Sequence, residues 1–149
     1  MALAKLVAMA AIAFAAGCSS FEATAPDGFA AYTGNRPYRA VSSDGVVYRV
    51  RTEHDNSDAT MSFWREALKK RMESAGYNFL REGDIKAVGA SDGYLLEVTA
   101  PYGLKDYTYM MAVFKSGKHL VLVESSGEVT AFEKHRPAIL AAVEKLRVN

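Results

Sequence analysis

Two stretches near the end of the chain would be apolar on both faces of a strand, and this feature limits the architectures open to the protein. They are residues 107–114, which read YTYMMAVF, and residues 120–123, which read LVLV. Such strands need an apolar cover on each side, because an antiparallel sheet with one solvated face shows apolar and polar residues in alternation. We therefore expect helices on both faces of the sheet centre, in three layers.

Strand-like runs occupy most of the second half of the chain. They lie at residues 78–88, 93–100, 106–115 and 118–125, with turn-forming residues between them. Ser116 and Gly117 form the tightest of these connections, which has the length of a two-residue hairpin loop. An earlier run, residues 46–51, places apolar residues on one face and arginines largely on the other, as in a half-exposed strand. These patterns predict neighbouring antiparallel strands.

Two amphipathic segments supply the helices. The first spans residues 58–75, is capped by Ser57 or Asp58, and ends at Gly76, since glycine readily adopts the left-handed conformation that follows a helix. The second is C-terminal, and Pro137 suits its first turn because the nitrogen needs no hydrogen bond there. The apolar stripes are Met61, Trp64, Leu68, Met72 and Ala75 in the first segment and Ile139, Leu140, Val143 and Leu146 in the second.

This order of strand, helix, meander and C-terminal helix resembles the PsbP-like sandwich. That fold is shared by the extrinsic lumenal subunit of photosystem II, a Ran-binding nuclear import factor and several small bacterial lipoproteins. The segments from Phe63 to Tyr77 and from Tyr107 to Leu146 carry the resemblance. It implies an α+β domain over residues 38–149, with a central antiparallel sheet and helices on both faces. Members mostly act as binding or assembly factors, but a fold does not transfer a function.

The N-terminal residues 1–17 have the features of an export signal. All except Lys5 and Gly17 are apolar, and the run is shorter than the roughly 20 residues that a membrane-spanning helix needs. A positive residue, a short apolar core and small residues at the end are typical of a secretory signal peptide. Without this segment the chain is neutral, so the apolar and basic biases of the whole sequence belong mainly to the signal.

The residues that follow the apolar core indicate the type of signal. Ala15-Ala16-Gly17-Cys18 resembles the lipobox of bacterial lipoproteins, although leucine is commoner than Ala15 at its position. The resemblance implies cleavage between Gly17 and Cys18, a diacylglycerol on the Cys18 sulfur and acylation of its nitrogen. Serine after the cysteine resembles the pattern for transfer to the outer membrane of a two-membrane bacterium. The alternatives are an ordinary signal peptide with a free thiol, or an uncleaved anchor.

The segment of residues 18–37 reads as a tether between this anchor and the domain. It contains prolines and glycines and no sustained periodicity, and an extended chain of this length reaches roughly 60 Å at about 3.3 Å per residue. Phe21, Phe29 and Tyr32 are apolar for a linker. The sequence therefore leaves open whether the later part of the segment packs along the domain.

Charge and cysteine content exclude several function classes. A formal net charge of +1 gives no basic surface of the kind that nucleic-acid binding requires. A single cysteine forms neither an internal disulfide nor a multi-cysteine metal site. The domain is also long enough to bury a core without such cross-links. We expect no cofactor and no nucleic-acid partner.

A catalytic serine is one candidate site. Residues 89–93 match the G-x-S-x-G nucleophile elbow with Ser91 as the nucleophile, and Asp106 with His119 or His135 would complete a triad. The elbow needs a helix after the serine, but the residues that follow are strand-like. A glycine-rich hairpin turn explains the pattern better.

The remaining candidates are a metal site and a partner contact. His54 lies beside Asp55 and Asp58, but the histidines have no H-x-H or HExxH spacing, so we predict no metal centre. The basic residues 69–71 fit a solvated helix face, with an anionic lipid or partner as the alternative. Tyr102 lies in a loop between two strands, where an exposed aromatic side chain is suited to contact a partner.

Taken together, these features favour a lipid-anchored, non-enzymatic envelope protein. We expect it on the outer membrane, facing the periplasm, where its domain binds or supports another envelope component. The leading alternative is a small-ligand or metal-binding lipoprotein, and a small hydrolase is a distant third.

Overall fold

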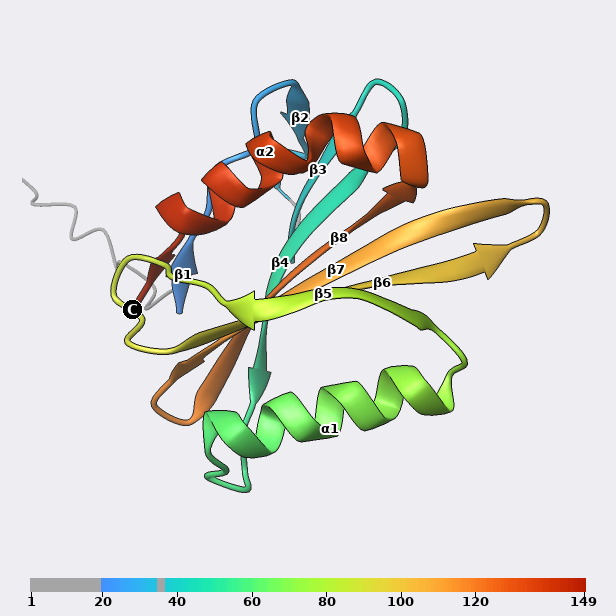
Figure 1. The fold of residues 1–149 in the computed structure, drawn as a ribbon. Helices are drawn as coiled ribbons and strands as arrows, with labels where there is room; N and C mark the ends of the chain where they lie inside the picture. The colour runs from blue at the N-terminus through green and yellow to red at the C-terminus, as the bar shows by residue number, and fades with distance from the viewer. Residues whose placement is uncertain (1–19, 35–36) are drawn as a thin grey trace, which may run out of the picture.

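A seven-stranded antiparallel sheet is the main element of the computed structural model, which describes residues 20–34 and 37–149 (Figure 1). Its strands, in spatial order, are β2 (Phe29–Ala31), β3 (Tyr38–Ser42), β4 (Val47–His54), β8 (His119–Glu128), β7 (Lys105–Ser116), β6 (Gly93–Tyr102) and β5 (Asn78–Asp84). The predicted antiparallel meander is present in β5 to β8. The doubly apolar strands β7 and β8 lie at its centre.

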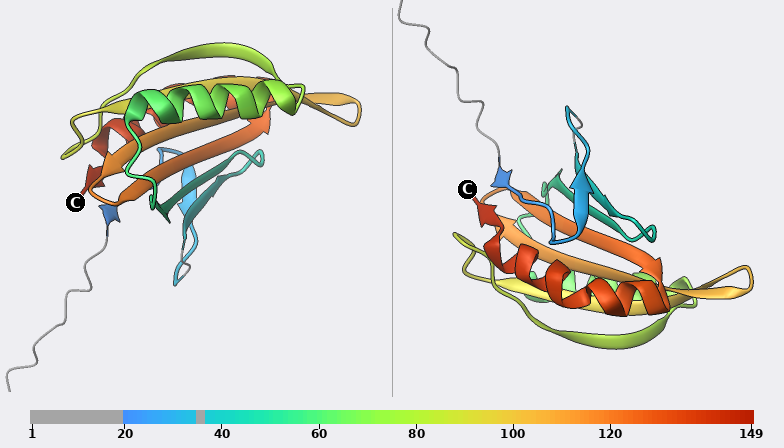
Figure 2. Two further views of the ribbon diagram at one scale, coloured as in Figure 1. Left: turned by 90° about the horizontal axis from the view of Figure 1, so that it is seen from below. Right: turned by 90° about the horizontal axis from the view of Figure 1, so that it is seen from above.

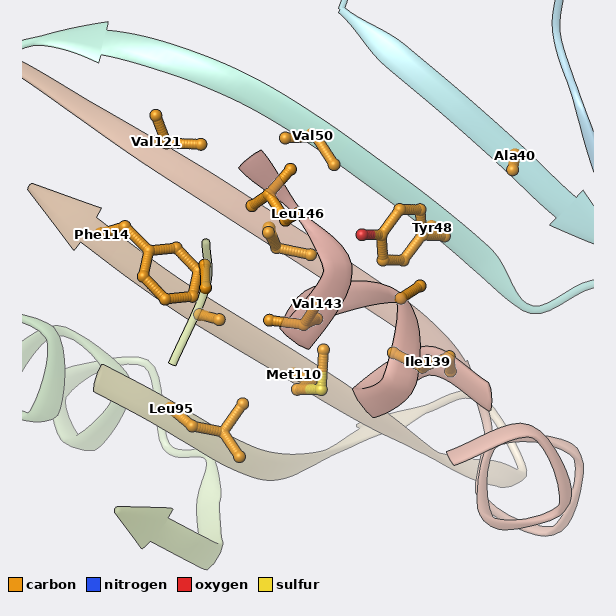
Figure 3. Packing of buried hydrophobic residues seen from close by; sticks show 14 of the residues in the cluster. Ala40, Tyr48, Val50, Leu95, Met110, Phe114, Val121, Ile139, Val143 and Leu146 are labelled. Carbon is orange, nitrogen blue, oxygen red and sulfur yellow. The ribbon is translucent and has the colours of Figure 1, made fainter. Parts of the chain in front are cut away.

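Two helices cover opposite faces of this sheet. Helix α1 (Met61–Ser74) lies on one face and α2 (Val129–Lys145) on the other, as the two views in Figure 2 show. The buried side chains form two separate clusters, one beneath each helix. Figure 3 shows the α2 side, where Ile139, Val143 and Leu146 pack over Met110 and Phe114 of β7. The predicted α+β fold in three layers is confirmed.

Helix α1 begins later than the sequence suggested, at a different cap. The side chain of Thr60 accepts a hydrogen bond from the amide of Phe63 at 3.3 Å. Ser57 is not the cap because its hydroxyl donates to the carboxylate of Asp55 at 2.6 Å. Asp58 has a positive φ of 49° and contacts Lys115, so it belongs to the turn before the helix.

The C-terminus of α1 is as predicted. Gly76 has a φ of 75°, and its amide donates to the carbonyl of Glu73 at 3.0 Å. The amide of Tyr77 donates to the carbonyl of Met72 at 3.1 Å. These two bonds form a Schellman motif, in which glycine supplies the left-handed residue without a steric penalty.

Helix α2 begins much earlier than the sequence suggested. Strand β8 ends at Glu128, and the side chain of this residue caps the helix by accepting from the amide of Ala131 at 3.3 Å. Pro137 therefore lies inside the helix rather than in its first turn. The early turns are retained because Phe132 is fully buried beneath them, and this packing offsets the one hydrogen bond that proline cannot make.

A buried ion pair joins α2 to the sheet. Glu97 of β6 has no exposed surface and accepts hydrogen bonds from Nε and Nη2 of Arg136, the shortest at 2.7 Å. Arg81 of β5 lies 3.4 Å from the same carboxylate and also pairs with Glu133 of α2 at 3.0 Å. The two arginines thus connect β5, β6 and α2 at one charged centre.

Part of the expected tether lies on the domain. Strand β1 (Phe21–Glu22) pairs with β9 (Arg147–Val148), and β2 adds an edge strand to the main sheet. Phe21 and Phe29 pack against the core beneath α2. The packing that the sequence left open is therefore observed for residues 20–34. The signal segment, the lipobox and Cys18 lie outside the described residues.

The strand expected over residues 78–88 ends at Asp84. Beyond it, the amide of Val88 donates to Leu146 and its carbonyl accepts from Val148, each at 2.8 Å. The loop after β5 thus pairs with the C-terminal segment instead of extending the strand. In the part of the chain that the structure describes, no helix has the length and apolar character needed to cross a membrane.

We predict that Arg136→Met destabilises the protein by about 3 kcal/mol, because it leaves the buried Glu97 carboxylate with a single, longer contact. Urea unfolding of the purified protein measures this change. Adding Glu97→Gln in the same chain should recover part of the loss, since a neutral amide costs less to bury. A loss below about 0.5 kcal/mol for Arg136→Met, a typical surface value, would show that the pair does not hold α2 in place.

Candidate binding groove

Ion pairs along one flank of α1 hold the helix toward one edge of the sheet. Arg65 pairs with Asp84, and Lys69 pairs with Glu82 at 3.0 Å, so both contacts reach β5. The opposite flank of α1 faces β7, β8 and β4. The helix therefore leaves part of the sheet face on that side uncovered, although these strands present apolar residues there.

The uncovered part of the face is a groove made of two adjoining pockets of about 590 and 420 Å³. Arg71, Met72 and Tyr109 line both pockets, which makes the groove continuous. The larger pocket is also lined by Ala75, Tyr77, Ala100, Pro101, Tyr102, Tyr107 and Ser126. The smaller is also lined by Arg51, Glu53, His54, Trp64, Leu68, Met111, Val113, Leu120, Leu122 and Glu124. Aromatic and aliphatic side chains thus dominate a surface with a few polar groups, as in ligand and peptide sites.

A charged cluster occupies the floor of the groove. Glu124 of β8 accepts hydrogen bonds from Nε of Arg51 at 2.8 Å and from the hydroxyl of Tyr109 at 2.8 Å. Burial raises the pKa of the Glu124 carboxyl, but these two hydrogen bonds, together with the positive charges of Arg51 and Arg49, outweigh burial and bring the pKa below its usual value. Burial, together with the neighbouring carboxylate, raises the pKa of Tyr109. Arg49 also lies 3.8 Å from the Glu124 carboxylate, and its buried Nε has no hydrogen-bond partner among the described residues, so the network holds Glu124 ionised without satisfying every polar atom around it.

Arg71 is a polar group of the groove with unused binding capacity. It lies on the flank of α1 away from β5, it is exposed, and its guanidinium makes no ion pair with any described residue. The basic residues 69–71 therefore have different environments. Lys69 is paired with Glu82, whereas Arg71 lines the groove. A free guanidinium beside aromatic walls is suited to an anionic or planar group.

The β6–β7 hairpin ends the groove with an exposed aromatic residue. Tyr102 is 76% exposed, and its ring packs edge-on against Tyr107 with centroids 5.7 Å apart. Leu104, at the turn, is fully exposed. The hairpin extends beyond the helices at the right of Figure 1. The structure thus places Tyr102 at an accessible tip, and its contact with a partner stays a prediction.

The residues of the hypothetical hydrolase triad do not come together. Ser91 precedes β6, whereas Asp106 pairs with Pro101 near the far end of that strand, about 27 Å away at about 3.4 Å per residue. His135 is on α2 and contacts Asp44 at 2.7 Å.

Both glycines of the G-x-S-x-G pattern have a packing role instead. A Cβ at Gly89 would collide with the carbonyl oxygen of Val148, and one at Gly93 would collide with the carbonyl oxygen of Ile85 and the ring of Phe114. The pattern therefore marks two close approaches of the chain. A strand, not a helix, follows the serine.

The aspartates beside His54 do not form a metal site with it. Asp55 is turned inward, where its carboxylate accepts from Ser57 and, at 3.3 Å, from the indole of Trp64. Among the described residues, no group of three or more histidine, cysteine, aspartate or glutamate side chains is placed to hold a metal ion. The contact of His54 with His119, with ring centroids 5.2 Å apart, was not predicted from the sequence. Only the register of β4 with β8 brings them together.

Solved structures with the same fold support this architecture. LpqN, which is involved in cell envelope biogenesis of Mycobacterium tuberculosis, superposes with a TM-score of 0.69 at 10% identity, covering 87% of this chain and 83% of LpqN. Cyanobacterial PsbP (CyanoP) from Synechocystis sp. PCC 6803 gives 0.60 at 13% identity, covering 87% of each chain. PA94 from Pseudomonas aeruginosa, a protein of unknown function described as a putative regulator, gives 0.60 at 11% identity, covering 78% of this chain and 94% of PA94.

The protein therefore has a PsbP-like fold, and likeness at these identities concerns the fold alone. No protein-family model matches the chain. No curated protein matches it in sequence.

We predict that Glu124→Gln destabilises the protein at neutral pH by about 1 kcal/mol, because the charged contacts to Arg51 and Tyr109 are weakened. The lowered pKa of Glu124 sets the sign of the pH dependence. The carboxylate stabilises the fold fully above its unfolded-state pKa of about 4.3, and this contribution disappears as the pH falls through the lower folded-state pKa. Urea unfolding of both proteins between pH 7 and pH 3 should therefore show their difference shrinking in acid. A difference that stays constant over this range would contradict the prediction.

Proposed function

We propose that this protein is a lipid-anchored, non-enzymatic module of the bacterial envelope that binds another envelope component through the β6–β7 hairpin and the adjoining groove. The exposed Tyr102 at the end of a largely apolar groove is the observation that carries this proposal. Exposed aromatic residues beside desolvated pockets are typical anchors of protein interfaces. The lipobox-like residues 15–18 support the anchor, and Ser19 after the cysteine supports the outer-membrane location.

The arrangement of the two ends of the molecule fits this proposal. Strand β1 is held by β9, and the amide of Asn149 donates to the carbonyl of Ser20 at 3.1 Å. All views in Figures 1 and 2 place β1 and the C-terminus at one end of the molecule and the β6–β7 hairpin at the other. An anchor at Cys18 would precede the docked strand by three residues, or about 10 Å of extended chain. The hairpin would then point away from the lipid surface.

The envelope role also draws support from one structural neighbour. LpqN is described as involved in cell envelope biogenesis, and CyanoP and PA94 are not described as enzymes. At 10% identity, LpqN supports the envelope role by analogy of fold alone.

We predict that Cys18→Ser transfers the protein from the membrane fraction to the soluble envelope fraction. Acyl chains contribute about 0.8 kcal/mol per buried methylene, so their loss removes the anchor. Fractionation of cells that express the full chain, followed by immunoblotting, measures the distribution. Ser20→Ala is the matched control and should stay with the membrane. Retention of the Cys18→Ser protein on the membrane would contradict lipid anchoring at this residue.

We predict that Tyr102→Ala weakens binding to the envelope partner by at least about tenfold, because it removes an aromatic anchor worth about 1.4 kcal/mol or more. A photoreactive amino acid at position 102 in intact cells first identifies the partner, and its affinity for the purified variants is then measured. Tyr32→Ala, at another site that is 52% exposed, is the matched control and should bind normally. Equal affinity of the Tyr102→Ala and Tyr32→Ala proteins would show that the hairpin is not part of the interface.

A small-ligand site is the second candidate, and the free guanidinium of Arg71 favours it. An elongated molecule with an anionic group would place that group at Arg71 and its apolar part along the groove. A thermal-shift experiment distinguishes the two functions. A ligand in the groove should raise the thermal midpoint of the Tyr102→Ala protein but not of Arg71→Met, whereas a hairpin interface depends on Tyr102.

A further inference from the structure

Two of the three histidines lie together at one end of the sheet. His54 is the last residue of β4, His119 is the first of β8, and the two are partners in the register of these strands. Their ring centroids are 5.2 Å apart, with 54° between the ring planes. Both side chains are exposed, and neither hydrogen-bonds or ion-pairs with another described residue. The pair therefore combines accessibility with unused nitrogen donors.

The backbone holds the two histidines in the right positions before any ligand arrives. The amide of Asp55 donates to the carbonyl of Lys118 at 2.8 Å, one step beyond the pair in the ladder. Hydrogen-bonded and non-bonded pairs alternate along antiparallel strands, so His54 and His119 form a non-bonded pair, in which side chains approach most closely. The strands are ordered already, so bringing both rings to one ion costs little further conformational entropy.

The distance between the rings fits one tetrahedral metal ion. With metal–nitrogen bonds of about 2.1 Å, the ion lies about 3.2 Å from each ring centroid. A tetrahedral angle between the two ligands then separates the centroids by about 5.2 Å, whereas the right angle of a square-planar site would give about 4.5 Å. The observed 5.2 Å is compatible with the tetrahedral value, and it is also an ordinary separation of two rings in contact, as for Phe29 and His135.

The surrounding groups leave the remaining coordination positions open. Glu53 pairs with Arg51, and the carboxylate of Asp55 is buried against Ser57. His135, the third histidine, contacts Asp44 at 2.7 Å and serves as the internal comparison. An ion on the pair would thus have two protein ligands and solvent at its other positions, which is one protein ligand fewer than in catalytic zinc sites, so we expect weaker binding than at those sites.

We propose that His54 and His119 form a binding site for a single Zn²⁺ ion across β4 and β8. Neutral imidazole is a preferred ligand of Zn²⁺, and the ring separation accommodates the tetrahedral arrangement. This site does not depend on lipid anchoring or on the hairpin interface. Because the ion would link two central strands, its binding should also raise the thermal midpoint of unfolding.

Titration of the purified full chain with ZnCl₂ tests the site, using a purification tag without histidine. Calorimetry should show one equivalent of Zn²⁺ bound, and the imidazole resonances of His54 and His119 should shift together in NMR spectra. His54→Ala and His119→Ala should each lower the affinity by at least about tenfold, since one of two protein ligands is lost. Mg²⁺ should not bind, because it prefers oxygen ligands.

His135→Ala is the matched control and should bind Zn²⁺ as the unmodified chain does. Both histidines of the pair are exposed, so circular dichroism should show folded variants. Unchanged Zn²⁺ affinity in the His54→Ala/His119→Ala double variant would overturn the proposal. Loss of affinity in His135→Ala with retention in the double variant would likewise overturn it.

Discussion

The structure depends on the need to cover both faces of β7 and β8. These strands carry buried apolar residues on each side, among them Met110 and Ala112 toward α2 and Met111 and Val113 toward α1. Neither face is stable in water, so each needs a cover: α2 packs on β7 and β8, whereas α1 lies mainly against β6 and covers its side of these strands only in part. Helix α2 covers its face with a stripe that includes Phe132 and Val143. Helix α1 is held toward β5 by ion pairs along its flank, and the groove is the area that it leaves uncovered.

The buried contact of Glu97 with Arg136 complements this apolar packing. Removing two charges from water is costly, and a buried pair contributes little net stability compared with apolar residues of the same size. Apolar packing alone would also allow α2 to slide along its face. A bidentate guanidinium–carboxylate contact fixes both position and orientation, so we interpret the pair as setting the register of α2 on β6.

The sequence predicted the layers and most strands because these follow from local periodicity. It placed the end of α1 correctly, since Gly76 acts within one turn of the chain. It failed for the start of α2, because burial of Phe132 is a tertiary effect that outweighs the usual preference of Pro137 for a first turn. The exposure of Tyr102 was also predictable, although the residue is the last of β6 and not part of a loop, because the strand runs two residues further than the pattern indicated. The groove and the His54–His119 pair were not, because both depend on how β4 and β8, distant in sequence, align with each other and with α1.

The groove connects the two ends of the molecule. Its larger pocket is bounded by Tyr102, at the tip of the β6–β7 hairpin, and its smaller pocket reaches His54, at the end of β4. Asn149 lies beside this second end, because its carbonyl accepts from Ser116, which pairs with His119. A partner that enters from the hairpin would therefore first meet Tyr102 and then the guanidinium of Arg71, whereas the side chains of His54 and His119 alternate onto the α2 face of the sheet, with Val121 and Val123. Binding at the groove and at the histidine pair involves different side chains on opposite faces of a shared sheet, so coupling between them would have to pass through the pairing of β4 with β8.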